Sequence, residues 1–407
     1  MKVLWLGHNL AYPPKGGALQ RNFNLLRQIA RKAEVHFLGF DQPITRPPNV
    51  SPAQCLEALS RFCASADWVP LNAGPLHSQY LLALRGILKG EAYEFVWLQS
   101  SRMAEKLERL VQRVKPDVVH VDALGLAQYL PLVGGVGSVL NHHDVESSKM
   151  AVRSRKAQNP LLKTYFAYEA HKLADAESAW CPRFGVNLVV SVEEAHLLDR
   201  LTPGLTVRVV PNGVDTDYFT PRRDPGNQTV LFCGSMDMHP NQEAMEYFIS
   251  RVWPLIVKTQ PRAKLQIVGR RPPDWLEAIG ETEPAIEVTG FVEDVRPYFR
   301  GAAVCVCPIL SGGGTRLKIL DSLAMGVPVV STQFAASGLD LEDGKHLLFG
   351  ETEAQFAEHT VRLLSNPTMR ATLASAGAER VNQLYSWSVV GQPLLDAYEL
   401  AVRKRSH

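Results

Sequence analysis

Three consecutive glycines, Gly312, Gly313 and Gly314, separate an apolar run from a stretch with helical periodicity. Glycines let a backbone approach a ligand closely and adopt positive φ. The amino terminus of the helix that follows offers free N–H groups and partial positive charge, which suit a diphosphate. Arg316 and Lys318 follow and add full positive charge. The pattern favours a phosphate-binding loop over its alternative, a flexible turn followed by two solvated bases.

The spacing of these two bases sets a geometric condition. Arg316 and Lys318 are two positions apart, which is about 200° around a helix. Both reach one diphosphate only if Arg316 lies in the loose first turn. Asp321 shares a helix face with Lys318. Its carboxylate could accept hydrogen bonds from the hydroxyls of a ribose, or it could simply pair with Lys318.

A second glycine pair, Gly16 and Gly17, closes the loop after the first predicted strand and precedes a helix. This loop could likewise bring its backbone close to a ligand at the amino terminus of a helix, and Lys15 and Arg21 add positive charge. A lone pair of glycines is weak evidence, because a simple turn has the same composition. The chain has no Gly-x-Gly-x-x-Gly sequence here, which disfavours a dinucleotide cofactor.

Two adjacent histidines, His142 and His143, end a predicted buried strand and precede Asp144. Neighbouring residues on a strand point to opposite sides, so we expect at most one of them to face a ligand. The further ligands of a metal site are not apparent, and Asp144 is expected to cap the next helix. We therefore predict one histidine at the ligand-binding edge and no metal.

Basic residues cluster in the region that follows. They are Lys149, Arg153, Arg155, Lys156, Lys163 and Lys172. Such a cluster is usually a solvated face, but it could also meet anionic lipid or a lipid-diphosphate acceptor. Glu169, taken alone, is expected to be a solvated acid.

Short β-branched runs alternate with helical stretches along the whole chain, which favours doubly wound parallel sheets of the α/β class. Strands are predicted at residues 2–7, 34–40, 117–121, 138–141, 187–190, 229–233, 264–268, 286–289, 303–307 and 327–331. Helices are predicted near residues 18–32, 100–114, 145–157, 161–180, 192–200, 240–250, 294–301, 315–325, 353–365, 367–384 and 387–403. Turn-rich residues 220–228 separate the two series. We therefore expect two Rossmann-like domains, 1–206 and 207–386, facing across a cleft, with the helix 387–407 packing back on the first.

Composition excludes several classes of protein. The 407 residues carry a formal charge of +2, which gives no reason to expect nucleic-acid binding. The six cysteines lack the spacing of a disulfide framework or a zinc site, and Cys305 and Cys307 are expected in a buried strand. No stretch of 18 apolar residues occurs, and residues 76–89 suit a core or interfacial helix. We expect a cytoplasmic protein, possibly one peripheral to the inner face of the membrane.

Taken together, these motifs resemble family four of the glycosyltransferases, whose members have the GT-B fold and retain anomeric configuration. The resemblance rests on residues 13–17, 141–146, 189–194, 209–219, 232–235 with 240–241, 267–269, 288–294 and 311–332. The last segment, SGGGTRLKILDSLAMGVPVVST, is the most specific. The first domain is then expected to bind the acceptor and the second to bind the nucleotide-sugar donor.

The resemblance also implies roles for individual residues. His143 matches a histidine near the donor sugar, and Asp321 matches the second acid of the Glu-x7-Glu motif, which holds the ribose. Phe291 and Val292 would border the nucleobase. The donor site is expected to comprise Gly16, Gly17, Gly234, Ser235, Gly269, Phe291, Val292, Gly312, Gly313, Gly314, Thr315 and Asp321, with His143, Arg316 and Lys318 in catalytic roles.

Three departures from the family pattern stand out. Gly313 occupies the position of the first acid of the motif, and Asp321 is shorter than the usual glutamate. The Arg and Lys of the family are replaced around Met236 and Asn241. Our hypothesis is that Arg316 and Lys318 take over the neutralisation of the diphosphate.

The expected reaction is transfer of a sugar from a UDP- or GDP-linked donor to a hydroxyl of a saccharide or lipid-linked acceptor, in cell-surface polysaccharide or glycolipid synthesis. Asp215 and Asp217 form an Asp-x-Asp, but it lies in the turn between the domains, so no metal cofactor is expected. Two alternatives remain: a sugar-nucleotide epimerase of the same fold, and a non-catalytic nucleotide-sugar-binding protein.

Overall fold

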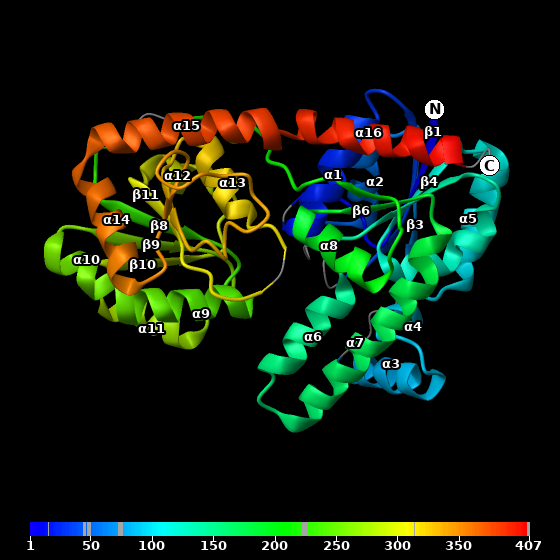
Figure 1. Ribbon diagram of the computed structural model, residues 1–407, viewed down its shortest axis with the longest axis horizontal. Helices are drawn as coiled ribbons and strands as arrows, with labels where there is room; N and C mark the ends of the chain where they lie inside the picture. The colour runs from blue at the N-terminus through cyan, green and yellow to red at the C-terminus, as the bar shows by residue number, and fades with distance from the viewer. Residues whose placement is uncertain are drawn as a thin grey trace. The chain divides into compact units, whose positions relative to one another are not determined.

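A computed structural model describes residues 1–14, 16–43, 46, 50–71, 76–221, 226–312 and 314–404. The chain divides into two compact units. The first comprises Met1–Pro211 together with Val390–His407, and the second comprises Asn212–Val389 (Figure 1). Each unit is an α/β layer structure with its own parallel sheet.

The sheet of the first unit has seven parallel strands in the order β3-β2-β1-β4-β5-β6-β7. They are β1 (Lys2–Gly7), β2 (Glu34–Asp41), β3 (Ser65–Pro70), β4 (Val118–Asp122), β5 (Gly137–Asn141), β6 (Val186–Val189) and β7 (Val207–Val209). The central strands β1, β4, β5 and β6 are buried along nearly their whole length, as expected for a sheet covered on both faces. The parallel strands β1 and β4 are neighbours in the sheet although β2 and β3 separate them in the chain, so their carboxyl ends share one edge.

The helices of the first unit fill the connections between these strands. They are α1 (Gly17–Ile29), α2 (Pro52–Ser60), α3 (Leu76–Lys89), α4 (Tyr93–Trp97), α5 (Ser101–Val114), α6 (Glu146–Lys156), α7 (Pro160–Trp180), α8 (Val192–Leu201), two 3₁₀ turns (Leu124–Val133 and Cys181–Arg183), and α16 (Trp387–Lys404). The final helix α16 packs on this unit, where the Tyr398 hydroxyl lies 2.9 Å from Nδ1 of His120 on β4. The helices α6 and α7 form an antiparallel hairpin.

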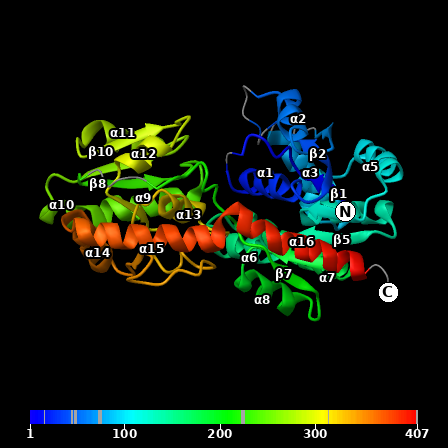
Figure 2. The ribbon, with the colours of Figure 1, turned by 90° about the horizontal axis from the view of Figure 1, so that it is seen from above.

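The second unit has six parallel strands in the order β10-β9-β8-β11-β12-β13. They are β8 (Thr229–Cys233), β9 (Lys264–Val268), β10 (Ile286–Gly290), β11 (Val304–Cys307), β12 (Val329–Ser331) and β13 (Leu348–Phe349). The helices are α9 (His239–Tyr247), a π-helical turn (Phe248–Val252), α10 (Trp253–Thr259), α11 (Asp274–Thr282), α12 (Arg296–Gly301), α13 (Leu317–Ala324), α14 (Glu353–Ser365) and α15 (Pro367–Tyr385). Figure 1 shows α9, α10 and α11 on one face of this sheet and α12, α13 and α15 on the other. Figure 2 shows α11 and α12 near the β10 edge, whereas α14 and α15 cover the opposite half.

The ten strands predicted from the sequence are confirmed, with ends that shift by one or two residues. Cys305 and Cys307 lie buried in β11, and all six cysteines are free thiols. Three strands escaped prediction: β7 and β13 have only three and two residues, and β3 is only partly buried, so its apolar pattern is weak. Within the described part of the chain, no helix combines the length and the apolar composition needed to cross a bilayer.

Candidate active site

The carboxyl ends of β1, β4 and β5 bring together polar residues that are far apart in the sequence. His8 follows β1, Asp122 ends β4, and Asn141 ends β5. The three strands are neighbours in the sheet, so these side chains share one edge. This edge is where open α/β sheets bind ligands. Of these residues, the sequence analysis had singled out only the segment that begins at Asn141.

Asp122 is fully buried, and its carboxylate is the centre of this cluster. One oxygen lies 2.9 Å from Nε2 of His143 and accepts a hydrogen bond from the amide of Asn141 at 2.8 Å. The other lies 2.8 Å from Nδ1 of His8 and accepts a hydrogen bond from the amide of Asn22 on α1. Four donors therefore converge on one acid.

Burial by itself would raise the pKa of Asp122, but the facing His143 and His8 outweigh it and hold this pKa well below its usual range. Burial would likewise lower the pKa of His8, but the charge and the hydrogen bonds of Asp122 raise it. Asp122 is thus a fixed negative charge that orients two imidazoles, as a carboxylate does for a catalytic histidine.

The two adjacent histidines have different surroundings. His142 is buried, its Nε2 lies 3.2 Å from the amide oxygen of Asn187, and burial lowers its pKa to about 4. The side chain of His143 keeps 18% of its surface exposed. Because Asp122 accepts a hydrogen bond from Nε2 of His143, the neutral ring presents Nδ1 as an acceptor. His143 can therefore accept a hydrogen bond from a ligand at Nδ1, whereas the ring of His142 is buried and bonded within the protein.

The ring nitrogens of His8 and His143 and a carboxylate oxygen of Asp122 all lie within 4.8 Å of one another, as three metal ligands would. The hydrogen bonds argue against that role. Each oxygen of Asp122 already accepts two of them, and two come from the amide nitrogens of Asn22 and Asn141, which cannot bind a cation. A divalent ion here would have to break this network.

Glu94 is a second acid near the cluster that sequence reasoning missed. It lies on α4, and its Oε1 accepts a hydrogen bond from the backbone N–H of Gly125 at 3.1 Å. A Cβ on Gly125 would lie 2.6 Å from Cγ of Glu94, so the glycine allows this approach. Burial, together with the charge of Glu146, raises the pKa of Glu94 to about 7.

At the start of α1 the two glycines leave space for a ligand, whereas Arg21 has a structural role. Gly16 precedes α1 with φ of 99°, and an added Cβ on Gly16 or Gly17 would meet nothing within 4 Å, so this turn leaves space above it. Arg21 was expected to add charge for a ligand. Instead it is buried, and it donates to the carbonyls of Val210 and Pro211, each at 2.8 Å. Lys15 lies outside the described residues.

Two further acids differ from their predicted roles. Asp144 was expected to cap α6, but it pairs with Lys149 at 2.9 Å. The N–H groups at the start of α6 are bonded instead by Glu194 and Glu177, which arrive from other helices. Glu169 was expected to be solvated, but it is buried and accepts a hydrogen bond from the N–H of Tyr93, the first residue of α4.

In the second unit the glycine loop joins β11 to α13. Gly312 and Gly314 have φ of 100° and 76°, which L-residues rarely adopt. Gly313 lies outside the described residues. Arg316 immediately precedes the helix, so it occupies the loose first turn that the spacing required. Its guanidinium donates to the carbonyls of Gly314 at 2.9 Å and Ser311 at 3.2 Å, so it folds over the loop.

The ammonium of Lys318 is held in place by contacts from other elements of this unit. Its Nζ donates to Oδ1 of Asn241 at 2.7 Å and lies 4.1 Å from the centre of the Phe232 ring. Burial lowers its pKa. Asn241 in turn donates to the carbonyl of Ser235 at 2.7 Å. The position that holds a basic residue in the family thus orients a lysine from another helix.

Asp321 lies on the same face of α13, one turn beyond Lys318. Its Oδ1 is buried and has no hydrogen-bond partner, and burial raises its pKa to about 8. Among the described residues no ion pair joins it to Lys318, so the alternative of a simple acid–base pair is wrong. A buried carboxyl without a partner costs free energy, and hydroxyl groups of a ligand could satisfy it.

Close backbone packing surrounds these side chains. An added Cβ on Gly269 would lie 1.8 Å from the carbonyl oxygen of Gly234, and one on Gly234 would lie 2.6 Å from Nζ of Lys318. Phe291 follows β10 and is 62% exposed, as a residue that borders a planar ligand should be. Val292 is partly buried against the core of this unit.

An acid from another helix also reaches the glycine loop. Glu243 on α9 accepts a hydrogen bond from the hydroxyl of Ser311, which directly precedes Gly312. Pro240 on the same helix packs against Gly312, where an added Cβ would lie 2.9 Å from its ring. The loop that lacks the first acid of the family motif therefore has a carboxylate beside it.

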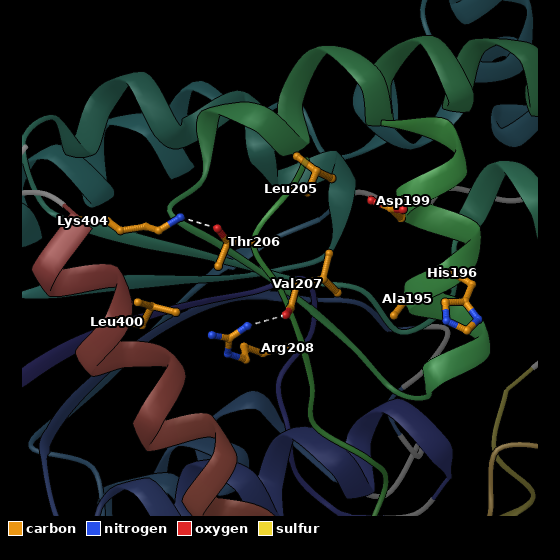
Figure 3. A pocket seen from close by; sticks show the side chains of 9 residues that line it. All are labelled: Ala195, His196, Asp199, Leu205, Thr206, Val207, Arg208, Leu400 and Lys404. Carbon is orange, nitrogen blue, oxygen red and sulfur yellow. Dashed lines mark hydrogen bonds between the residues drawn. The ribbon is translucent and has the colours of Figure 1, made fainter. Parts of the chain in front are cut away.

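A surface hollow of about 460 Å³ lies elsewhere on the first unit (Figure 3). Its lining comprises Ala195, His196, Asp199, Leu205, Thr206, Val207, Arg208, Leu400 and Lys404. It adjoins the amino end of β7, whereas the polar cluster lies at the carboxyl ends of the strands. Arg208 and Lys404 are hydrogen-bonded to Val207 and Thr206, so both cations already have partners. We assign it no part in catalysis.

Comparison with solved structures shows that the two units together have the GT-B fold of glycosyltransferases. Sucrose-phosphate synthase from Thermosynechococcus elongatus matches with a TM-score of 0.71 at 17% identity, over 98% of each chain. The Anabaena protein HepE, in complex with UDP and glucose, matches with a TM-score of 0.65 at 13% identity, over 97% of this chain and 98% of that one.

Two glycosyltransferase families match the sequence, one in each half of the chain. Residues 15–218 match the family described as Glycosyltransferase Family 4, and residues 227–366 match Glycosyl transferases group 1. The chain therefore belongs to glycosyltransferase family 4, which confirms the resemblance seen in its motifs, and it is a glycosyltransferase. A phosphatidyl-myo-inositol mannosyltransferase from Mycobacterium leprae is 26% identical over 284 residues, which are 66% of this chain and 75% of that protein.

Proposed function

We propose that this glycosyltransferase is a retaining, metal-independent enzyme. It would transfer a sugar from a nucleotide-diphosphate donor to a hydroxyl of a saccharide or lipid-linked acceptor. The observation that carries the proposal is the buried, unpartnered carboxyl oxygen of Asp321 beside the glycine loop. A ribose with two vicinal hydroxyls would supply the missing donors, and a diphosphate would then lie toward the amino terminus of α13.

The leaving group needs positive charge, because negative charge develops on the diphosphate as the bond to the sugar breaks. Arg316 is the residue before α13, and Lys318 is the second residue of that helix. The ammonium of Lys318 is held by Asn241 and by the face of Phe232 rather than by an acid, so its charge is available to a phosphate. We propose that these two bases and the free N–H groups of the helix neutralise the leaving diphosphate.

We propose that His143 contacts the donor sugar and that Asp122 positions the imidazole ring of His143. The bond from the anomeric carbon to the phosphate oxygen breaks, and a bond from that carbon to the acceptor oxygen forms on the same face. The acceptor proton passes to the departing phosphate oxygen. Asp122 does not serve as a nucleophile, because four hydrogen bonds already engage its oxygens. This favours retention by a same-face reaction without a covalent sugar–enzyme intermediate.

The relatives support the choice of substrates. HepE was crystallised with UDP and glucose, and the relative from Mycobacterium leprae is named a mannosyltransferase that acts on phosphatidyl-myo-inositol. We therefore propose a UDP- or GDP-linked hexose as donor and an acceptor used in cell-surface polysaccharide or glycolipid synthesis. The six free thiols favour a cytoplasmic location.

A thermal-shift screen of nucleotide sugars, followed by mass spectrometry of products with a pool of candidate acceptors, tests this proposal. Nucleotide release that depends on an acceptor, together with a product heavier by one sugar, is the expected result. Conversion of the donor without an acceptor would instead identify an epimerase. Tight donor binding with neither reaction would identify a non-catalytic binding protein, and either outcome would overturn the proposal.

A further inference from the structure

The helix α3 of the first unit presents an apolar face that nothing in the described structure covers. Five large apolar side chains on it are exposed: Tyr80, Leu81, Leu84, Ile87 and Leu88. Tyr80 and Leu88 keep 73% and 79% of their surface in solvent. Single exposed apolar residues need no explanation, but a contiguous group on one helix marks an interaction surface.

These residues form one continuous stripe. At 100° per residue they occupy an arc of about 120° on the helix, and the residues that face the protein occupy a different arc. Gly86 lies on the inner side, where an added Cβ would lie 3.0 Å from the carbonyl oxygen of Glu91. Arg85 and Lys89 lie on one side of the apolar stripe and are exposed. Residues 76–89 include no acid, and Lys89 pairs at 3.7 Å with Glu91, which follows the helix. The helix is therefore amphipathic, with its apolar side turned outward.

The hairpin of α6 and α7 has a second surface with the same chemistry. Leu161 and Leu162 lie at its turn, and Leu161 is 81% exposed. Residues 147–168 include five bases and no acid, and one of these bases, Lys149, pairs with Asp144 and Glu146 just before this stretch. Four of these bases, Arg153, Arg155, Lys156 and Lys163, are exposed. The exposed leucines thus lie beside four exposed bases that form no ion pair among the described residues.

Both surfaces lie on the same side of the first unit. Figure 1 shows α3 and the α6–α7 hairpin extending away from the sheet on the side opposite to α16. Figure 2, seen from the α16 side, shows α16 in front of the hairpin. A single flat partner can therefore approach α3 and the turn of the hairpin from the same side.

We propose that the apolar stripe of α3 and the basic turn of the α6–α7 hairpin together bind the surface of an anionic lipid bilayer. An amphipathic helix lies in the plane of such a surface, with its apolar side among the acyl chains and its flanking bases at the headgroups. Clustered lysines and arginines add electrostatic attraction to anionic lipid. This arrangement would hold the enzyme beside a lipid-linked acceptor.

The positive charge of this surface favours an anionic bilayer over a second copy of this chain as its partner. A symmetric dimer through this face would bring Arg85 and the four exposed bases of the hairpin close to their own copies, and this repulsion opposes association. An anionic membrane has the complementary sign. The inference goes beyond the proposed function but does not depend on it, because vesicle binding is measured without donor or acceptor.

The test is sedimentation of the full-length protein with vesicles of phosphatidylcholine alone or with about 30 mol% phosphatidylglycerol. We expect binding only to the anionic vesicles and a strong decrease when salt rises from about 0.1 to about 0.5 M. Leu84→Glu with Leu88→Glu, and separately Arg155→Glu with Lys156→Glu, should each lower the bound fraction at least about fivefold. The matched control, Leu255→Glu with Lys258→Glu on the exposed side of α10, should bind as the wild type does.

Thermal melts show whether each variant is folded, and the hairpin variant tests the proposal even if the α3 variant is unstable. The proposal is overturned if the wild type ignores anionic vesicles, or if the control loses binding as much as the two test variants. Light scattering that shows a dimer, converted to a monomer by Leu84→Glu, would assign the face to a second copy and also overturn it.

Discussion

Asp122 joins two histidines that lie 135 positions apart in sequence order, with Nδ1 of His8 at 2.8 Å and Nε2 of His143 at 2.9 Å from its two carboxylate oxygens. The three residues come from the ends of β1, β4 and the segment after β5. Only the parallel sheet makes them neighbours. This relationship fixes the tautomer of His143 and directs its other ring nitrogen away from the acid, where a substrate could use it.

Replacement of Asp122 by asparagine should abolish most of the activity. The variant keeps the size of the side chain but loses the negative charge that orients both imidazoles. We expect kcat to fall by about 10²-fold or more, with the KM for the donor nearly unchanged. Steady-state kinetics measure both values. The matched control is Asp117→Asn at the opposite end of β4, and the role of Asp122 is wrong if the two variants turn over equally fast.

Asp321 should determine how strongly the enzyme prefers a ribose with both hydroxyls. In the wild type, a nucleoside diphosphate that lacks the 2′- and 3′-hydroxyls should bind at least about tenfold more weakly, because one buried carboxyl oxygen stays unpartnered. The variant Asp321→Ala should bind this nucleotide and the ordinary nucleoside diphosphate with the same affinity. Titration calorimetry gives the four affinities. An equally large preference in the variant would contradict ribose recognition by this residue.

Arg316 and Lys318 are expected to neutralise the diphosphate. Arg316→Ala and Lys318→Ala should each lower kcat by about tenfold or more, since a charge-assisted hydrogen bond to the leaving group is lost. Lys318→Arg tests position rather than charge, because the space under the loop is filled by Asn241 and Phe232. If both alanine variants kept turnover within about twofold of the wild type, the hypothesis that Arg316 and Lys318 take over the neutralisation of the diphosphate would be abandoned.

The sequence predicted the second unit's site better than the first's. The glycines, Arg316, Lys318 and Asp321 are close together in the chain, so local spacing revealed their common site. His8, Asp122 and Glu94 are isolated polar residues, and nothing local distinguishes them. One signal was available: Asp122 directly ends a buried strand, at the edge where such sheets bind ligands.

Burial also explains why the roles predicted for two charged residues were wrong. Arg21 and Glu169 carry charges that are usually solvated, but backbone groups are among their main partners, Val210 and Pro211 for the arginine and Tyr93 for the glutamate. Backbone partners leave no trace in residue types. Likewise, residues 76–89 suited either a core or an interfacial helix by composition, and only the packing of α3 shows its apolar side to be exposed.

The close approach of the two backbones at Gly234 and Gly269, directly after the parallel strands β8 and β9, predicts a specific stability effect. In Gly269→Ala the new methyl group would overlap the carbonyl oxygen of Gly234, so β8 and β9 must shift. We expect a loss of about 2–3 kcal/mol in the free energy of unfolding, measured by urea denaturation. Gly301→Ala is the control, since its Cβ would meet nothing within 4 Å. Equal stability of the two variants would show that the close approach is relaxed in solution.

His142 should make stability depend on pH. Burial lowers its pKa to about 4, so below the ordinary value of 6.5 the unfolded chain binds a proton that the folded chain does not. Stability therefore falls as pH falls from about 6.5 to 4. Glu177, with a pKa raised to about 7 by burial, has the opposite effect, so the comparison must be made between variants.

The suitable variant is His142→Gln, which cannot titrate. From pH 7 to pH 4.5, the wild type should lose about 2 kcal/mol more unfolding free energy than the variant does. Urea midpoints at the two pH values give the difference. Parallel pH profiles for the two proteins would mean that His142 is protonated as readily in the folded state as in the unfolded chain.

The most direct measurement follows the anomeric proton of the transferred sugar by NMR, with an α-linked nucleotide sugar, a cognate acceptor and an excess of EDTA. The account predicts a product that keeps the α configuration, formed in step with nucleoside diphosphate release and at an undiminished rate with the chelator. A β-linked product, or a reaction that stops with EDTA and resumes with a divalent ion, would contradict retaining transfer without a metal.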